Sequence, residues 1–256
     1  MKMKKYLLIL ILCAVFFVLT NGFAAKKLPD SCAVGDSANL IEKLKRTSVL
    51  ILATEQKVVI GTGFLTTDER KQVLVVTNAH VAKIGNPLFV RVNSADKIID
   101  YLASLYKINE GFDIAVLVLK KVTPDQQWVS TDLIIPIGMF GSSSDIVEGR
   151  EIIYIGYPLG LGVEEKNYPV SRQATIAQVV KNRATFLIDG FASHGNSGSP
   201  VFSRKDGKLL GIVVSFEPDF IDSFQNQKLM LRIPFNSGIS KAVSVEAVKA
   251  VIFSKS

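Results

Sequence analysis

Cysteine is scarce in this sequence of 256 residues, which contains only Cys13 and Cys32. Cys13 lies in an apolar run near the N-terminus, so removal of that run would leave Cys32 alone. A single cysteine forms no internal disulfide. The folded part must therefore be stabilised by its hydrophobic core, and a cysteine-poor exported domain fits a bacterial periplasm or the cell exterior.

The N-terminal residues 1–25 have the pattern of a signal peptide. Three lysines precede a nearly unbroken apolar run over residues 6–20, and small residues follow it. We expect cleavage near Ala24 or Ala25, which gives a periplasmic or secreted protein. The alternative is an uncleaved inner-membrane anchor, because residues 6–25 are long enough to span a bilayer.

A strong charge of one sign is also absent. The formal net charge of +7 falls to +4 once Lys2, Lys4 and Lys5 are removed, and the remaining basic residues are dispersed along the chain. They are not interleaved with aromatic side chains as in nucleic-acid-binding surfaces. We therefore predict no nucleic-acid partner, and membrane contact only if the N-terminal segment is retained.

No internal repeat, low-complexity tract or long linker interrupts the chain, so we expect one domain with two lobes. Short apolar runs bounded by turn residues predict an all-β fold with two closed sheets. The expected strands are Val49–Ala53, Val58–Leu65, Val73–Thr77, Phe89–Val92, Ile98–Tyr106, Ile114–Leu119, Glu151–Gly156, Val170–Val180, Thr185–Asp189, Pro200–Phe202, Leu209–Phe216 and Met230–Ile233.

Two helices are expected at the ends of this strand-rich region. Ser37–Thr47 carries apolar residues at helical spacing, and so does Ser244–Phe253. Ser244 precedes the apolar positions of the second helix and is a suitable N-cap.

The segment from Gly195 to Pro200 (Gly-Asn-Ser-Gly-Ser-Pro) places Ser197 between two glycines on a tight turn. A serine hydroxyl is a poor nucleophile at neutral pH unless a base takes its proton and the resulting oxyanion is stabilised. Gly195 lets the backbone turn so that the amides of Gly195 and Ser197 can point at one spot. We predict that these two amides form an oxyanion hole.

The base should be a histidine, and the chain has only His80 and His194. His80 follows an apolar strand and a small-residue turn, whereas His194 is too close to Ser197 in the chain to act as its base. Asp113 opens an apolar strand, where a carboxylate without a partner would be unexpected. We predict that Asp113 orients His80. Asp96 and Asp100 are alternatives that lack the buried strand that follows.

The order His80, Asp113, Ser197, together with three neighbouring motifs, resembles the trypsin-like serine peptidases, and most closely the bacterial HtrA/Deg branch. The motifs are Gly61–Leu65, the segment EIIYIGYPLG at 151–160, and Arg232–Asn236. The resemblance covers residues 45–240 and implies two six-stranded antiparallel β-barrels. It departs from many HtrA sequences in having Gly198-Ser199-Pro200 after the serine, and we expect no PDZ domain within this chain.

The resemblance also implies a protease domain over residues 37–256, with lobes at about 45–120 and 145–235. It places Phe191 and Ala192 at the base of a specificity pocket and Val214, Ser215 and Phe216 on its wall, while His194 is expected to contact substrate. None of these is an acid. Lys or Arg at P1 should therefore be disfavoured, and small or medium aliphatic residues should be preferred.

The expected function is an exported serine endopeptidase that acts on peptides or unfolded proteins through an acyl-enzyme, with no metal and no other cofactor. Two alternatives keep the same fold. One is a catalytically weak peptide-binding or chaperone-like module, and the other is an esterase. An α/β-hydrolase is disfavoured because its nucleophile precedes its acid and its histidine in the chain.

Overall fold

The computed structural model describes residues 34–94, 97–163, 167–180, 184–225 and 228–254, so the predicted signal peptide at 1–25 lies outside the described residues. The chain separates into two compact units, residues 1–38 and 39–256. Helix α2 (Val34–Thr47) begins in the first unit and ends in the second, and it agrees with the expected N-terminal helix. Within the described ranges, no helix is both long and apolar enough to cross a membrane.

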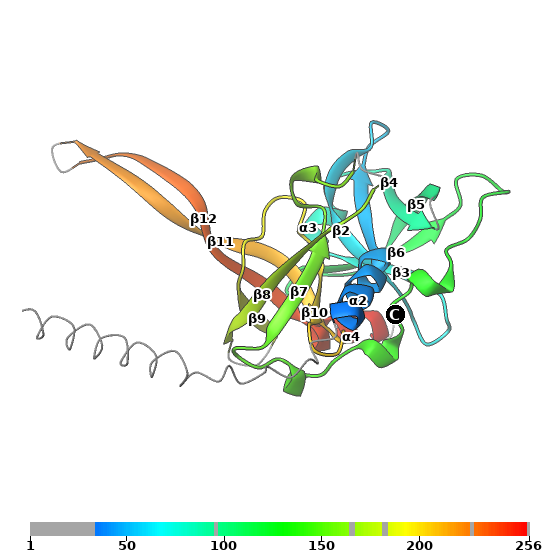
Figure 1. The fold of residues 1–256 in the computed structure, drawn as a ribbon. Coiled ribbons are helices and arrows are strands. Elements are labelled where there is room, and N and C mark those ends of the chain that lie inside the picture. The colour runs from blue at the N-terminus through cyan, green and yellow to red at the C-terminus, as the bar shows by residue number, and fades with distance from the viewer. Residues whose placement is uncertain (1–33, 95–96, 164–166, 181–183, 226–227, 255–256) are drawn as a thin grey trace, which may run out of the picture. The chain divides into compact units, whose positions relative to one another are not determined.

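The first half of the second unit is a closed antiparallel barrel in the strand order β1-β2-β3-β6-β5-β4 (Figure 1). A short helix, α3 (Ala79–Ala82), follows β3. The strands are β1 (Ser48–Ala53), β2 (Val58–Thr67), β3 (Val73–Thr77), β4 (Leu88–Ser94), β5 (Lys97–Asn109) and β6 (Ile114–Lys120).

The second half is another closed antiparallel barrel, in the order β10-β11-β12-β9-β8-β7. Its strands are β7 (Glu151–Gly156), β8 (Val170–Val179), β9 (Thr185–Asp189), β10 (Pro200–Ser203), β11 (Leu209–Gln225) and β12 (Lys228–Ser244). Single 3-10 turns occur at η1 (Thr131–Leu133), η2 (Ile137–Met139), η3 (Ser143–Asp145) and η4 (Pro158–Gly160). The predicted fold of two six-stranded antiparallel barrels is confirmed.

Alternating side chains of the strands fill four buried apolar clusters, as the two-residue period of a strand requires. On β7, Ile152 and Tyr154 point into the core of the second barrel, whereas Ile153 and Ile155 join a cluster with Phe64 of β2. This last cluster lies between the barrels. The two barrels therefore share a buried apolar interface. Packing in this interface fixes the positions of the residues where the barrels meet.

Helix α4 (Val245–Phe253) packs on the cluster between the barrels through residues that include Val248 and Ile252. The Ser244 hydroxyl accepts a hydrogen bond from the backbone N–H of Ala247 at 3.4 Å, so the predicted N-cap is confirmed. The helix has nine residues, or about two and a half turns, and its stability comes from burial of its apolar face.

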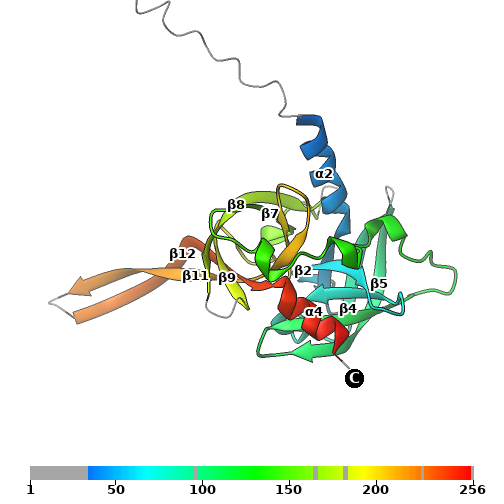
Figure 2. The ribbon, with the colours of Figure 1, turned by 90° about the horizontal axis from the view of Figure 1, so that it is seen from below.

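One feature departs clearly from the sequence prediction. We expected strands over Leu209–Phe216 and Met230–Ile233, but β11 and β12 continue as a long hairpin that extends away from the second barrel (Figures 1 and 2). Pro218 and Pro234 predicted strand ends, because proline lacks a backbone donor. Both prolines lie in a two-stranded ribbon, where each strand has an open edge that tolerates a missing donor.

Candidate active site

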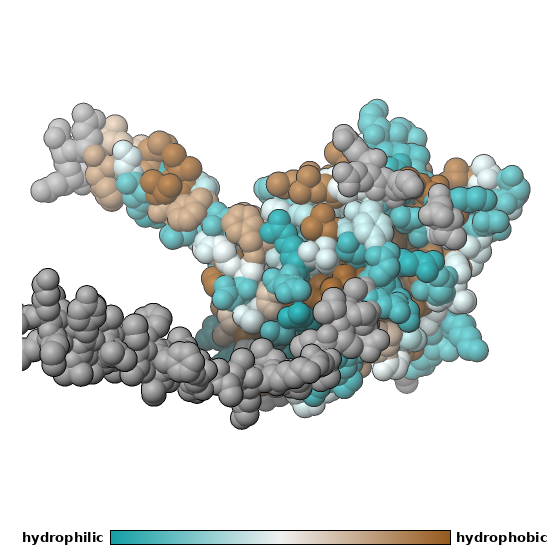
Figure 3. Space-filling view, viewed as in Figure 1, coloured by the Kyte–Doolittle hydropathy of each residue, from teal (hydrophilic) through white to brown (hydrophobic). Residues whose placement is uncertain are grey.

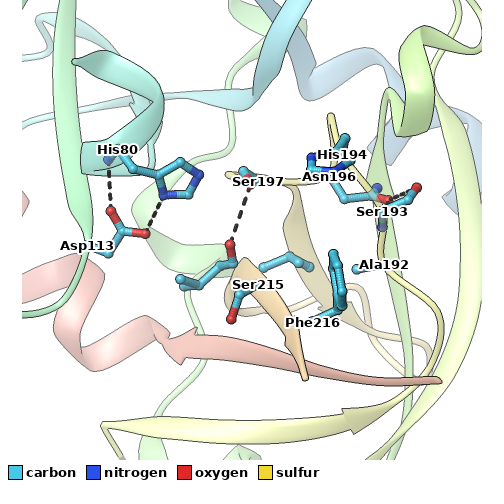
Figure 4. A pocket seen from close by; sticks show the side chains of 11 residues that line it. His80, Asp113, Ala192, Ser193, His194, Asn196, Ser197, Ser215 and Phe216 are labelled. Atoms are coloured by element: carbon cyan, nitrogen blue, oxygen red, sulfur yellow. Dashed lines mark hydrogen bonds and ion pairs between the residues drawn. The ribbon is translucent and has the colours of Figure 1, made fainter. Parts of the chain in front are cut away.

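His80 and Asp113 are joined by two hydrogen bonds at the edge of the first barrel. The carboxylate of Asp113 accepts from the His80 backbone N–H at 2.9 Å through Oδ1, and it contacts Nδ1 of the imidazole at 2.7 Å through Oδ2 (Figure 4). An ionised carboxylate can only accept, so Nδ1 carries the proton and Nε2 has a free lone pair. These contacts fix the orientation of the ring.

Local structure at the ends of β3 and β6 produces this contact. Asp113 has a φ of 55°, a left-handed conformation that aspartate tolerates better than most residues. Its carbonyl accepts from the backbone N–H of Ala79 at 3.1 Å and from the side-chain amide of the buried Asn78 at 2.9 Å. The turn before β6 is therefore tied to the turn after β3, and this brings the two side chains together.

Ser197 lies on a loop of the second barrel whose conformation depends on glycine. Gly195 and Gly198 have φ values of 89° and 82°, which favour glycine. A Cβ at Gly195 would lie 2.2 Å from the carbonyl oxygen of Tyr157, and one at Gly198 would lie 2.1 Å from that of Thr62. No other residue fits these positions without moving the backbone.

Thr62 holds this loop from the opposite barrel. Its hydroxyl donates to the Gly195 carbonyl at 2.7 Å and accepts from the Tyr157 backbone N–H at 3.1 Å, and its own N–H donates to the Ser197 carbonyl at 2.8 Å. The sequence analysis did not assign Thr62 a role in the site. A polar residue between two glycines of an otherwise apolar strand was the available signal.

One pocket of about 410 Å³ contains side chains from both barrels (Figure 4). His80 and Asp113 enter it from the first barrel, and Ser197 enters it from the second. The Ser197 hydroxyl donates to the Val214 carbonyl at 3.4 Å, and within the described part of the chain it makes no hydrogen bond to His80. In unliganded enzymes such catalytic hydrogen bonds are often long and tighten when substrate binds.

The backbone around Ser197 leaves two amide donors free. The carbonyls of His194 and Asn196 accept from the N–H groups of Leu159 at 2.6 Å and Ser199 at 2.9 Å. In a trans peptide the C=O and N–H point in opposite directions, so the amides of Gly195 and Ser197 point away from those contacts. Neither amide has an acceptor among the described residues. This geometry is compatible with the predicted oxyanion hole.

Five of the six predicted substrate-binding residues line the same pocket: Ala192, His194, Val214, Ser215 and Phe216. The rings of His194 and Phe216 pack edge to face at 6.4 Å. The remaining lining residues, which the sequence analysis did not select, are Ser193, Asn196 and Val213. Asn196 is buried, and its side-chain oxygen accepts from the Ser193 backbone N–H at 3.1 Å.

Phe191 does not line this pocket. Its side chain is 49% exposed, and the Arg172 guanidinium lies 5.8 Å from the centre of its ring. Its carbonyl accepts from the Tyr154 hydroxyl at 2.9 Å and from Arg172. Of the two residues predicted for the base of the pocket, Ala192 is therefore in the lining and Phe191 is not.

Of the alternative acids, Asp100 does not line the pocket. Asp100 lies on β5, where it accepts from the Arg91 guanidinium at 2.7 and 3.0 Å and from Lys57 at 2.7 Å. Burial opposes ionisation of Asp100, but these hydrogen bonds from Arg91 and Lys57 outweigh it and hold the pKa of Asp100 below its usual value. Asp96 lies outside the described residues.

In the part of the chain that the structure describes, no three His, Cys, Asp or Glu side chains gather closely enough to hold a metal ion. The chemistry available at the pocket is that of an oriented imidazole, a hydroxyl and two backbone amides.

Two closed antiparallel barrels with a pocket between them that holds His, Asp and Ser define the class of chymotrypsin-fold proteins. The family model of the trypsin-like peptidase domain matches residues 61–212. The chain therefore belongs to this family and is a serine endopeptidase. The match includes all three residues.

Two relatives of known name agree with this membership. The chain is 28% identical over 155 residues to "Magnetosome formation protease MamE" of Paramagnetospirillum magneticum, which covers 60% of this chain and 19% of that protein. It is 27% identical over 159 residues to "Serine protease Do-like HtrA" of Bacillus subtilis, covering 59% of this chain and 32% of the relative. The chain thus spans less than a third of the length of these relatives.

Among solved structures, a serine endoprotease from Yersinia pestis superposes with a TM-score of 0.59 at 19% identity. The superposition covers 83% of this chain and 64% of that one. At this level of identity the likeness supports the two-barrel fold.

Proposed function

We propose that this chain hydrolyses peptide bonds with Ser197 as nucleophile, His80 as general base and acid, and Asp113 as the group that orients His80. The observation that carries the proposal is the double hydrogen bond from Asp113 to the backbone and ring of His80, in the same pocket as Ser197. This arrangement leaves Nε2 of His80 as the proton acceptor. A structural histidine would not need both contacts.

The reaction has two halves that share the same groups. As Ser197 Oγ bonds to the substrate carbonyl carbon, its proton passes to Nε2 of His80. The protonated ring then gives this proton to the leaving nitrogen as the C–N bond breaks, which leaves an ester on Ser197. Water repeats the sequence on the ester, so the acid is released and Ser197 recovers its proton.

The amides of Gly195 and Ser197 would stabilise the oxyanion in both halves. Each such donor typically contributes about 3–4 kcal/mol of transition-state stabilisation. Their lack of an acceptor among the described residues supports this role. Because the Thr62 hydroxyl bonds the Gly195 carbonyl, Thr62 would keep this peptide in position before substrate arrives.

The pocket supports a preference for non-basic P1 residues. Its only acidic side chain among the described lining residues is Asp113, which is engaged by His80. A Lys or Arg side chain would enter without an acidic partner, at a cost of several kcal/mol. The packed rings of His194 and Phe216 narrow the space and favour small or medium aliphatic residues.

The protease domain would comprise residues 37–256, and the substrates would be peptides or unfolded proteins. The pattern of residues 1–25 supports export to a periplasm or cell exterior, with retention of that segment as a membrane anchor as the alternative.

Labelling with a fluorophosphonate tests the proposal, because the reagent requires an activated serine. We expect labelling of the wild type and of Ser144→Ala, an exposed serine outside the pocket, and no labelling of Ser197→Ala. Peptide cleavage by Ser197→Ala should fall on the order of 10⁴-fold or more. Near-normal cleavage by that variant would reject the triad. Labelling with ester cleavage but no amide cleavage would identify an esterase, and binding without labelling would identify a peptide-binding module.

A further inference from the structure

The hairpin beyond the second barrel has no role in the triad, yet it carries several exposed apolar side chains. We define the arm as residues 217–224 of β11 and 230–237 of β12. Every described apolar side chain of the arm with a large surface is exposed, and Figure 3 shows them gathered along it. A two-stranded ribbon of this kind is marginally stable in water by itself. The arm therefore has apolar surface available for another chain.

The two faces of the arm differ in chemistry. Residues paired directly across the ribbon share a face, and Asp222 pairs with Arg232. Their side chains form two hydrogen bonds of 2.7 and 2.8 Å, and the Arg232 guanidinium lies 5.1 Å from the centre of the Phe220 ring. This face therefore combines an internally paired charge with the exposed rings of Phe220 and Phe224, which alternate with Asp222 on β11.

The opposite face carries a stripe of four apolar side chains, which we call the apolar stripe. Ile221 and Ile233 are paired directly across the ribbon, and Leu231 and Phe235 lie two residues to either side of Ile233 on β12. Their exposed fractions are 60% for Ile221, 54% for Leu231, 47% for Ile233 and 42% for Phe235. Alternate positions on one strand are about 6.8 Å apart, the same period as side chains of an extended peptide.

The arm begins at the pocket. Val213, Val214, Ser215 and Phe216 line the pocket, and the same strand, β11, continues directly into the arm. The pairing of β11 with β10 ends at Ile212, and no other described strand pairs with this edge farther out. A polypeptide bound with its scissile bond at Ser197 has an open strand edge leading from the pocket to the apolar stripe. From Phe216 to Phe224 the strand spans about 26 Å.

We propose that the apolar stripe is an accessory substrate-binding site, which holds an extended apolar segment of the polypeptide substrate about five to ten residues from the scissile bond. This inference rests on the proposed peptidase function and specifies its substrate: unfolded chains with apolar residues at alternate positions. The stripe adds binding energy without contributing a group to the chemistry.

Two other occupants fit the observations less well. The described charged side chains of the arm are Glu217, Asp219, Asp222 and Arg232, and the only basic one is paired, so the arm would be repelled by an anionic lipid surface. A second copy of this chain would need more contact area, because a stable interface uses about 20–30 residues on each side and the stripe offers four.

The test compares peptides that share one cleavable sequence and differ in length. A short peptide is extended by ten residues at its N-terminus or its C-terminus, either with alternating Val and Ser or with Gly and Ser only. We expect the Val-containing extension on at least one side to raise kcat/KM about tenfold in the wild type, and the Gly/Ser extension to have little effect.

The stripe variant replaces Ile221, Leu231 and Ile233 with Thr, which retains a high strand propensity. It should lose the gain from the Val extension and cleave the short peptide at the wild-type rate. The matched control replaces three exposed apolar residues elsewhere, Val58, Ile98 and Val147, with Thr. The control should keep the gain.

Binding of the fluorescent Val-extended peptide to Ser197→Ala, with and without the three Thr substitutions, separates this proposal from the peptidase proposal. If the wild type cleaves no peptide but the stripe substitutions weaken binding about tenfold, the peptidase assignment fails and the accessory site stands. The accessory site is overturned if the stripe substitutions change neither the affinity for the Val-extended peptide nor the gain in kcat/KM that the Val extension gives. It is also overturned if the substitutions change only the sedimentation behaviour, or only binding to phosphatidylcholine and phosphatidylglycerol vesicles.

Discussion

The hydroxyl of Thr62 donates a 2.7 Å hydrogen bond to the carbonyl of Gly195, so a strand of the first barrel holds the loop of the second barrel that carries Ser197. The two residues are far apart in the chain. Because Thr62 is fully buried, its bonds have no competition from water. The relative placement of the two halves of the pocket therefore depends on the hydrogen bonds of the Thr62 side chain and backbone, as well as on the apolar cluster between the barrels.

Replacement of Thr62 by Val tests this dependence. The change keeps the side-chain volume but leaves the Gly195 carbonyl and the Tyr157 amide without their partner, so stability should fall by about 1–3 kcal/mol. We also expect kcat to fall about 10- to 100-fold, because a small displacement of the oxyanion amides weakens transition-state stabilisation. Steady-state kinetics and urea denaturation measure the two effects.

The matched control is Thr66→Val on the same strand. Thr66 is also fully buried and donates to the Ile135 carbonyl at 3.0 Å, outside the pocket. It should lose similar stability and keep its kcat. Equal kcat values for the two variants would show that Thr62 contributes only to folding, and Thr62→Ser should recover most of the activity.

Replacement of Asp113 by Asn tests the orientation of His80. An amide nitrogen next to Nδ1 would favour the tautomer with the proton on Nε2, and such a ring cannot accept the serine proton. We expect kcat to fall about 10⁴-fold with little change in KM. Asp100→Asn, at the alternative acid on β5, should leave kcat within about twofold; a larger loss in that variant than in Asp113→Asn would reassign the acid.

The ion-paired cluster of Asp100, Arg91 and Lys57 predicts a specific pH dependence of stability. The folded-state pKa of Asp100 lies below its ordinary value of 3.8. Its contribution is therefore present in full above about pH 4 and is lost as the pH falls through the folded-state pKa. At pH 7, Asp100→Asn should lower the free energy of unfolding by about 1–3 kcal/mol.

Denaturant titrations of the wild type and Asp100→Asn at pH 7, 4 and 3 measure this difference. The gap between the two proteins should narrow at pH 3. A gap that stays constant from pH 7 to pH 3 would mean that the ionised carboxylate does not stabilise the fold.

The ring of Phe216 should control P1 specificity. It lines the pocket and packs against His194 at 6.4 Å, so removing it opens the space between these residues. Phe216→Gly should raise cleavage after large aromatic residues about tenfold relative to cleavage after Val or Ala. Digestion of a peptide library followed by mass spectrometry reports the change.

Phe191→Gly is the control for this prediction, since the Phe191 side chain lies outside the pocket lining. It should leave the P1 profile unchanged. Dominant cleavage after Lys or Arg by the wild type would contradict the assignment of the pocket, and a shift in Phe191→Gly equal to that in Phe216→Gly would restore Phe191 to it.

Local patterns predicted most of the secondary structure. Apolar runs between turn residues located the strands of both barrels, and the Ser244 cap located the start of α4. The long β11–β12 hairpin was missed because Pro218 and Pro234 are signals against a central strand, and a sequence does not reveal which strand edges remain open. The sequence also could not show that Phe191 lies outside the pocket lining, because the position of a loop residue depends on distant contacts such as those of its carbonyl with Tyr154 and Arg172.

The sequence by itself determined the types of group available for chemistry: two histidines, a serine between glycines, and an aspartate at the start of a buried strand. These follow from backbone sterics and from the cost of burying an unpaired charge, which act within a few residues. Only the tertiary structure decided that Thr62 supports the Ser197 loop, that Phe191 lies outside the pocket lining, and that an apolar arm leads away from the pocket. Those features arise from contacts between segments distant in the chain, and neither residue type nor local spacing specifies such contacts.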